Sequence, residues 1–287
     1  MTGTFQRRGH PELKYGYKPG RHLLGVPPRK DAVTALSTVP VPTTDCGLDE
    51  DAIRALGILD QGPTPYCVSH GWTGAVRDCE QRNGNAAPQL GSRLWLMYFM
   101  HAIENDISGF DGAIVADGAE ALERVGLPPE TALPFSETNP NASMVKPSAD
   151  VIRQAYDQKA PIDYGQIMSV GTNRVDDVLR ALSAAGKGGK PCPVVFGCNV
   201  TNAFASNNLP PGYLVGAPDP GDIDGGHCMR IVRAVCDPGV TGGVKFRVVN
   251  SWSDGWGDGG MFWMTPAYLM DPATDDLHFA DYQGVTP

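Results

Sequence analysis

The first half of the chain carries hydrophobic residues at the three- and four-residue spacing of amphipathic helices. From Cys67 onward, apolar positions recur at this spacing until Asn83-Gly84, which is a typical helix stop. Ser92 can cap a second helix that continues to about Ile107. The pattern predicts three further helices, near residues 117–125, 148–159 and 173–185.

The second half carries short apolar runs that are rich in β-branched residues and separated by Gly-rich turns. Such runs predict strands. They cover residues 193–200, 227–236, 244–250, 261–264 and 278–282. Helices that precede the strands, instead of alternating with them, predict an α+β fold.

Residues 1–45 differ from the rest because they are rich in Pro, Gly and basic residues and have no helical period. We predict an extended arm that precedes a domain over residues 46–287. The basic pairs Arg7-Arg8 and Arg29-Lys30 are the one hint of a basic patch, and we interpret them as solvated.

Composition narrows the function classes. The chain has 287 residues, of which 41% are hydrophobic, enough for a sizeable core. Its net charge of −9 argues against general nucleic-acid binding. No apolar run is long enough to span a membrane, and residues 1–8 lack the apolar core of a signal peptide. We therefore favour a cytoplasmic or assembly-associated location, such as a virion, over secretion, and leave the location otherwise open.

The seven cysteines include no C-x-x-C pair, which argues against a zinc ribbon or a thioredoxin-type site. We interpret five of them as small core residues: Cys79, Cys192, Cys198, Cys228 and Cys236. The sequence leaves open whether one or two disulfides form among these cysteines. The acidic cluster of Asp219, Asp222 and Asp224 does not have calcium-loop spacing and predicts an exposed turn. We expect no metal and no cofactor.

Cys67 stands where a Pro-containing loop becomes a helix, a position where free amides and the helix dipole lower a thiol pKa. Gln61 lies six residues earlier and can donate to a developing oxyanion together with the Cys67 N–H. Taken singly, Cys67 could equally be an inert buried cysteine and Gln61 a solvated loop residue.

His227 follows two glycines and opens an apolar strand, and Asn250 ends a strand 23 residues later. The amide oxygen of Asn250 can fix the imidazole tautomer, and Trp252 can shield that hydrogen bond from water. His70 is a weaker alternative to His227, because it follows Cys67 on the same helix. A thiol, an imidazole and two amides are the groups that cysteine-based acyl transfer requires.

In order and spacing, these residues resemble the motifs of the papain-like (C1 family) cysteine peptidases, bacterial or phage-type members included. In that family a Gln precedes the nucleophile by six residues, the His starts a strand, and Asn-Ser-Trp follows. Residues 252–262 and 117–135 resemble further family segments, so the similarity covers about residues 46–270.

The resemblance implies a two-lobed α+β fold with a cleft between the lobes. The helical lobe would cover about residues 46–165, and an antiparallel β-barrel-like lobe would cover about 166–287. It implies a cysteine endopeptidase that hydrolyses peptide bonds of a peptide or protein substrate. The implied site consists of catalytic Cys67, His227 and Asn250, with Gln61 in the oxyanion hole and Trp252 as support.

The chain also departs from the family pattern. Val68 replaces the usual Trp, and Thr64-Pro65-Tyr66 replaces Cys-Gly-Ser, so the usual disulfide partner is absent. The 23-residue gap predicts a longer hairpin between the strands of His227 and Asn250. The arm is too short for the long helical propeptide of the eukaryotic enzymes. Substrate preference and zymogen control therefore do not carry over.

Two other functions stay open at this stage. One is a catalytically weak or inactive structural or binding subunit of a larger, phage-like assembly, with the arm lying on a partner subunit. The other is a transpeptidase or cell-wall amide hydrolase that uses the same thiol chemistry. For the peptidase, we expect iodoacetamide to modify Cys67 before the other cysteines.

Overall fold

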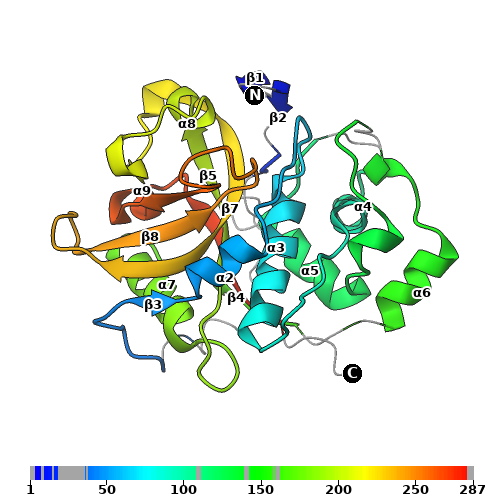
Figure 1. Ribbon diagram of the computed structural model, residues 1–287, viewed down its shortest axis with the longest axis horizontal. Coiled ribbons are helices and arrows are strands. Elements are labelled where there is room, and N and C mark those ends of the chain that lie inside the picture. Colours follow the sequence, from blue (N-terminus) through cyan, green and yellow to red (C-terminus); the bar gives the residue numbers. More distant parts are fainter. Residues whose placement is uncertain are drawn as a thin grey trace.

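The computed structural model describes residues 4–7, 10–14, 16–18, 36, 38–107, 111–138, 142–157, 159 and 162–282. These residues form a helical lobe and a β lobe that lie side by side, with α3 (Cys67–Arg82) between them (Figure 1). The α+β architecture predicted from the sequence is confirmed. Within the described residues, no helix combines the length and the apolar character needed to cross a bilayer.

The helical lobe contains α3 and the helices that pack near it. They are α4 (Arg93–Glu104), α5 (Val115–Val125) and α6 (Ala149–Asp157). Ser92 caps α4 as predicted, because its Oγ accepts a hydrogen bond from the Trp95 N–H at 3.2 Å. The helix ends three residues before Ile107, since Asn105 adopts the left-handed conformation at φ 58°.

The remaining helices are short or belong to the β lobe. They are α2 (Glu50–Ala55), α7 (Thr172–Ala184), α8 (Asn202–Ala205), α9 (Pro266–Met270) and the 3-10 segments Glu130–Ala132, Ala142–Met144, Pro211–Tyr213 and Pro220–Asp222. The sequence pattern predicts α7 but misses α2, which the Asp49 side chain caps.

One eight-stranded sheet forms the β lobe and reaches the helical lobe. Its order is β4 (Ile162–Ile167), β10 (Asp275–Tyr282), β5 (Val194–Thr201), β7 (Ile223–Cys236), β8 (Val244–Val249), β9 (Met261–Met264) and β6 (Leu214–Val215), with β3 (Cys46–Gly47) paired to β7. Its pairs are antiparallel except β6 with β9. The path ends at β4 and β6 without closing, so the expected barrel-like form is an open sheet. The sequence pattern misses β4, which straddles residue 165.

The hairpin between the strands of His227 and Asn250 is long, as the 23-residue gap predicts. β7 pairs with β8 in antiparallel register from Arg230 opposite Val249 to Cys236 opposite Val244. β7 also begins four residues before His227 and includes Gly225 and Gly226, because residues 223–227 pair with β5. His227 therefore lies inside a strand, opposite Cys198 of β5, rather than at a strand end.

Two large hydrophobic cores meet along α3. One fills the β lobe around Phe196, Phe246 and Trp256, and the other fills the helical lobe around Trp72 and Trp95. The helical-lobe core also takes side chains from β5, β7 and β10, so α3 packs directly against the sheet. We call this boundary between α3 and β7 the interlobe seam.

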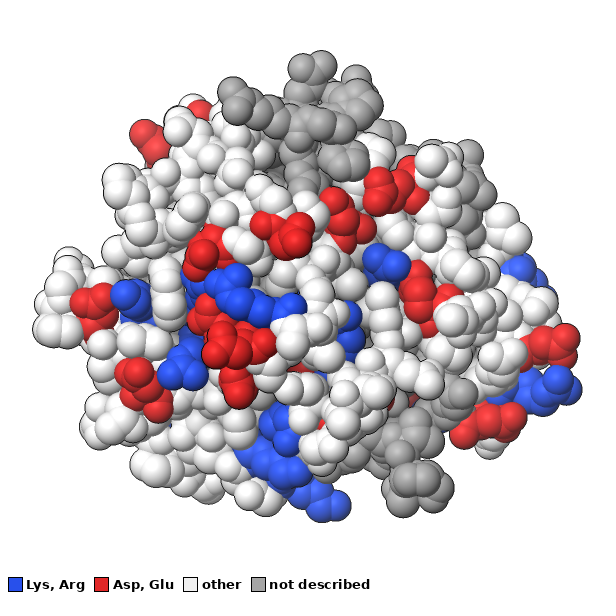
Figure 2. All heavy atoms as spheres, in the orientation of Figure 1, with Lys and Arg blue, Asp and Glu red and all other residues white. Residues whose placement is uncertain are grey.

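The described part of the arm begins with a hairpin. β1 (Thr4–Arg7) pairs antiparallel with β2 (His10–Lys14), and Figure 1 shows this hairpin where the two lobes meet. Arg8, Arg29 and Lys30 lie outside the described residues. On the face drawn in Figure 2, acidic and basic side chains are intermixed, so neither sign of charge dominates that face.

Candidate active site

Cys67 is the first residue of α3 and is fully buried at the interlobe seam. The loop before it is fixed from within, since the Thr64 hydroxyl donates to the Gln61 carbonyl at 2.7 Å. Tyr66 is anchored to the helical lobe by a 2.6 Å hydrogen bond between its hydroxyl and Ser143 Oγ. The residues that depart from the family pattern therefore support the position of Cys67.

His227 and Asn250 meet across β7 and β8. The imidazole Nε2 lies 2.8 Å from Asn250 Oδ1, and the Ser251 backbone N–H also donates to that oxygen at 2.7 Å. The Trp252 ring stacks on the imidazole with centroids 4.5 Å apart and planes 25° apart. All three side chains are buried, so this hydrogen bond is shielded from water.

These contacts fix the tautomer of His227. Because the Ser251 N–H can only donate, the atom it meets on Asn250 is the amide oxygen. His227 Nε2 must then carry the proton that it shares with this oxygen. Nδ1 keeps its lone pair and has no hydrogen-bond partner among the described residues, although it is buried. The imidazole therefore presents a free basic nitrogen.

Gln61 is joined to the same strand end. Its Oε1 accepts a hydrogen bond from Ser251 Oγ at 2.6 Å, and its Nε2 donates to the Thr64 carbonyl at 2.8 Å. Backbone pairing reinforces the link, because the Gln61 N–H donates to the Ser251 carbonyl at 2.9 Å. No role for Ser251 was predicted from the sequence, although its place within Asn-Ser-Trp was a signal.

Cys67 and His227 approach each other through the backbone of β7. The backbone of Cys228, which follows His227 directly, lies close enough to the Cys67 thiol to lower its pKa. No hydrogen bond joins the thiol to Nδ1 of His227 in this structure. The structure thus brings Gln61, Cys67, His227, Asn250 and Trp252 to one part of the seam, and no hydrogen bond joins the thiol to the imidazole.

Burial determines the protonation states of the Cys67 thiol and the His227 imidazole. It raises the pKa of the Cys67 thiol to about 11, although nearby backbone amides act in the opposite direction. It lowers the pKa of His227 to about 4, against the Asn250 hydrogen bond. The lowered thiol pKa expected from the helix start is therefore wrong for this state, because desolvation outweighs the amides. Near neutral pH both groups are uncharged.

No protein-family model matches the chain. The chain is 28% identical over 220 residues to an uncharacterised peptidase C1-like protein of Acanthamoeba polyphaga mimivirus, covering 76% of this chain and 67% of that protein. Its fold is similar to xylellain, a cysteine protease from Xylella fastidiosa, with a TM-score of 0.72, 24% identity and 95% and 96% of the two chains covered. It is also similar to procathepsin B from Trypanosoma congolense, with a TM-score of 0.62, 17% identity and coverage of 94% and 86%.

The chain therefore has a papain-like fold, and its sequence is similar to that of a C1-like peptidase. The other histidine near Cys67 has a structural place in this fold. His70 Nδ1 lies 2.7 Å from the Tyr66 carbonyl, and its Nε2 lies 3.2 Å from the Arg93 guanidinium. Both ring nitrogens are occupied, so His70 is not free to act on Cys67.

All seven cysteines of this papain-like chain are free, so the open question of disulfides is answered for this structure. Four of the five predicted core cysteines are buried, but Cys236 is exposed. It lies at the end of β7, where the sheet meets solvent. Because Cys67 is buried and Cys236 is exposed in this structure, we now expect iodoacetamide to modify Cys236 before Cys67.

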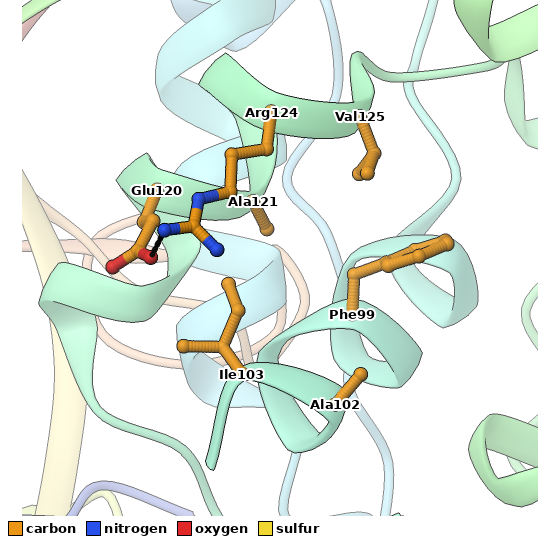
Figure 3. Close-up of a pocket in the computed structure, with 7 residues that line it drawn as sticks. All are labelled: Phe99, Ala102, Ile103, Glu120, Ala121, Arg124 and Val125. Carbon is orange, nitrogen blue, oxygen red and sulfur yellow. Dashed lines mark ion pairs between the residues drawn. The ribbon is translucent and has the colours of Figure 1, made fainter. Parts of the chain in front are cut away.

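Metal and ligand features elsewhere are sparse. Within the described residues, no group of three or more His, Cys, Asp or Glu side chains could hold a metal ion. Asp219 and Asp222 lie on an exposed turn, as predicted, whereas Asp224 lies in β7 and is half-buried. A hollow of about 470 Å³ lies between α4 and α5, lined by Phe99, Ile103 and the Glu120–Arg124 ion pair (Figure 3). It contains no nucleophile or imidazole.

Proposed function

We propose that the chain hydrolyses peptide bonds with Cys67 as nucleophile and His227 as the acid and base. The observation that carries this proposal is the fixed tautomer of His227. Its protonated Nε2 is held by Asn250, and its basic Nδ1 is unpartnered at the strand position next to Cys67. An imidazole held in this way is poised to take the proton of the thiol.

In the first half-reaction, the Cys67 proton moves to His227 Nδ1 and the sulfur attacks the peptide carbonyl carbon. The resulting oxyanion is stabilised by the Cys67 N–H, which is free because first-turn helix amides have no intrahelical acceptor. Gln61 Nε2 has a second hydrogen beyond the one given to Thr64, and Ser251 holds the amide so that this nitrogen is the donor. Nδ1–H then protonates the leaving amine, the C–N bond breaks and a thioester forms.

In the second half-reaction, His227 Nδ1 takes a proton from water while the water oxygen attacks the thioester. The tetrahedral intermediate collapses, the carboxylic acid leaves, and the sulfur recovers its proton from His227. Asn250 and Trp252 keep the imidazole oriented through both steps. No metal or cofactor enters this mechanism.

The test is hydrolysis of a fluorogenic peptide library by purified protein. We expect Cys67→Ala to lower kcat by at least about 10⁴-fold, because the nucleophile cannot be replaced by the remaining groups. Cys236→Ala is the matched control, since Cys236 is an exposed thiol far from these contacts, and it should retain activity. Turnover by Cys67→Ala at the wild-type rate would disprove the mechanism.

The remaining sequence predictions extend this proposal. We infer that residues 46–287 form the peptidase domain and that residues 1–45 are an arm. A partner subunit for the arm and a cytoplasmic or virion-associated location stay predictions of the sequence. Neither the transpeptidase nor the non-catalytic alternative has a specific feature among the described residues in its favour.

A further inference from the structure

The backbone carbonyl of Tyr66 accepts two side-chain hydrogen bonds in addition to the one that α3 provides. The helical bond comes from the His70 backbone N–H at 3.1 Å, and the Ser69 hydroxyl donates to the same oxygen at 3.0 Å. The third partner is the ring of His70, whose Nδ1 lies 2.7 Å from that oxygen. All three residues are fully buried, so these donors meet the oxygen away from water.

The peptide group that contains this carbonyl also contains the Cys67 N–H. Because Tyr66 directly precedes Cys67, the Tyr66 C=O and the Cys67 N–H belong to one planar unit. Hydrogen bonds to a carbonyl oxygen polarise its peptide group and thereby strengthen the N–H of that group as a donor. The donors to Tyr66 therefore act on the N–H that the proposed mechanism places in the oxyanion hole.

A contact on the far side of the His70 ring fixes its tautomer. Nε2 lies 3.2 Å from Arg93 Nη1, and a guanidinium can only donate, so Nε2 is the accepting nitrogen. The single proton of the neutral ring is then on Nδ1, which donates it to the Tyr66 carbonyl. Burial, and after it the charge of Arg93, lowers the pKa of His70 well below its usual value, so the ring is neutral near neutral pH.

Arg93 is itself held by Glu130 and Phe135. Its Nη2 donates to Glu130 Oε1 at 2.7 Å, and its backbone N–H donates to Oε2 at 3.1 Å. Its guanidinium carbon lies 4.4 Å from the centre of the Phe135 ring, which the His70 ring meets edge to face at 5.0 Å between centroids. A continuous series of contacts thus joins the Glu130 carboxylate to the peptide group of Cys67.

We propose that His70 is a positioning residue for the oxyanion hole, which orients and polarises the Tyr66–Cys67 peptide through its Nδ1–H. This inference rests on the proposed function. His70 acts through the peptide group and not on the reacting atoms, and Ser69 assists it with a weaker, neutral donor. The polarised N–H gains most when negative charge develops on the substrate oxygen, so its contribution belongs to kcat and not to KM.

The first test is steady-state hydrolysis of a fluorogenic peptide by full-length variants. We expect His70→Leu to lower kcat about tenfold and to leave KM unchanged, because the ring donor to the peptide is lost. Asn carries an N–H close to the place of Nδ1–H, so His70→Asn should restore most of kcat. Ser69→Ala removes the second side-chain donor and should lower kcat about threefold.

The matched control is Thr73→Val. Thr73 is as buried as Ser69, and its hydroxyl donates at 2.8 Å to the Ser69 carbonyl, one turn away from the peptide group of Cys67. This variant should keep the wild-type kcat. Equal losses for His70→Leu and His70→Asn, or a loss for Ser69→Ala no larger than that for Thr73→Val, would overturn the proposal.

The second test observes the peptide group directly, without turnover. Tyr66-Cys67 is the only Tyr-Cys pair in the chain, so labelling with carbonyl-¹³C tyrosine and ¹⁵N cysteine gives one cross-peak in a spectrum that correlates the two nuclei. We expect His70→Leu to move the carbonyl ¹³C signal upfield, because a hydrogen bond to the oxygen is lost, and His70→Asn to keep it near the wild-type position. An unmoved signal in His70→Leu would contradict the proposal.

The two measurements separate this inference from the proposed function. A moved carbonyl signal without hydrolysis by any protein, wild type included, supports the polarised peptide and rejects the peptidase. Hydrolysis with an unmoved signal and equal kcat in wild type and His70→Leu supports the peptidase and rejects the role of His70.

Discussion

At the scale of single residues, the side chains of the proposed site are oriented by hydrogen bonds from neighbouring residues that take no part in the proposed chemistry. Ser251 is the clearest case, because it serves both sides of the seam. Its backbone N–H fixes the Asn250 oxygen, and its hydroxyl fixes the Gln61 oxygen. Ser251 therefore fixes, through Asn250, the tautomer of His227, the proposed base. It also fixes the orientation of Gln61, the proposed oxyanion donor.

This arrangement predicts a graded effect of substitutions on kcat. Gln61→Ala removes an oxyanion donor and should lower kcat about 10²-fold or more. Ser251→Ala removes only the hydrogen bond that orients Gln61, so we expect a loss of about fivefold to tenfold. Ser206→Ala removes a surface hydroxyl at the C-terminal cap of α8 and serves as the control. Steady-state kinetics measure all three variants, and an equal loss for Gln61→Ala and Ser206→Ala would contradict the assignment.

The burial of His227 predicts a pH dependence of folding stability. Its pKa falls from the ordinary value of 6.5 to about 4 in the folded protein. A depressed pKa contributes stability that is fully present above pH 6.5 and is lost as the pH falls through about 4. The contribution is about 3 kcal/mol. Urea unfolding at a series of pH values should show wild type losing about this much more than His227→Gln between pH 7 and 4.

His70 also titrates in both proteins, since burial and the nearby Arg93 hold its pKa well below the ordinary value, and its contribution cancels in this comparison. Parallel stability curves for wild type and His227→Gln would mean that His227 is accessible to water in solution.

At the scale of helices and strands, the sequence predicts local elements well and their partners poorly. The start of α3 at Cys67 and the Ser92 cap of α4 follow from spacing and capping chemistry. β4 is missed because its short run has only weak alternation and depends on β10 for its place in the sheet. Contacts between distant elements, such as Gly226 with Tyr17, have no local signal in the sequence.

One buried ion pair joins the two elements that carry the nucleophile and the base. Arg230 of β7 donates from Nε to Asp78 Oδ2 of α3 at 2.6 Å, and both side chains are buried. Removing one partner of such a pair leaves the other charge buried without compensation, which costs about 3–5 kcal/mol. We therefore expect Asp78→Asn to lower the free energy of unfolding in urea by about 3 kcal/mol.

The control for this prediction is another Asp–Arg pair on a surface helix. Asp150 and Arg153 lie 2.8 Å apart on α6, but both side chains are exposed. Exposed pairs contribute about 0–1 kcal/mol, so Asp150→Asn should have little effect. Equal losses for the two variants would show that the α3–β7 pair does not stabilise the seam.

At the scale of the whole molecule, the proposed catalytic set follows from the sequence, whereas the burial of the site does not. The order of Gln61, Cys67, His227 and Asn250 is sufficient to propose the chemistry. Nothing in the spacing of these residues indicates that Cys67 and His227 are both fully buried in the folded chain. Whether a thiol is reactive depends on such burial, and burial is a property of the complete fold.

The reactivity of the seven free cysteines tests which thiols are buried in the folded protein. Cys236 is exposed, Cys46 is half-buried, and the other five are buried in the two cores. Titration of the native protein with a chromogenic disulfide should show Cys236 reacting first and Cys46 more slowly, since burial raises the pKa of the Cys46 thiol to about 11. Unfolding in guanidinium should expose all seven thiols. Cys236→Ser should remove the fast phase. A total of five thiols after unfolding would instead reveal a disulfide, and would contradict the free cysteines seen here.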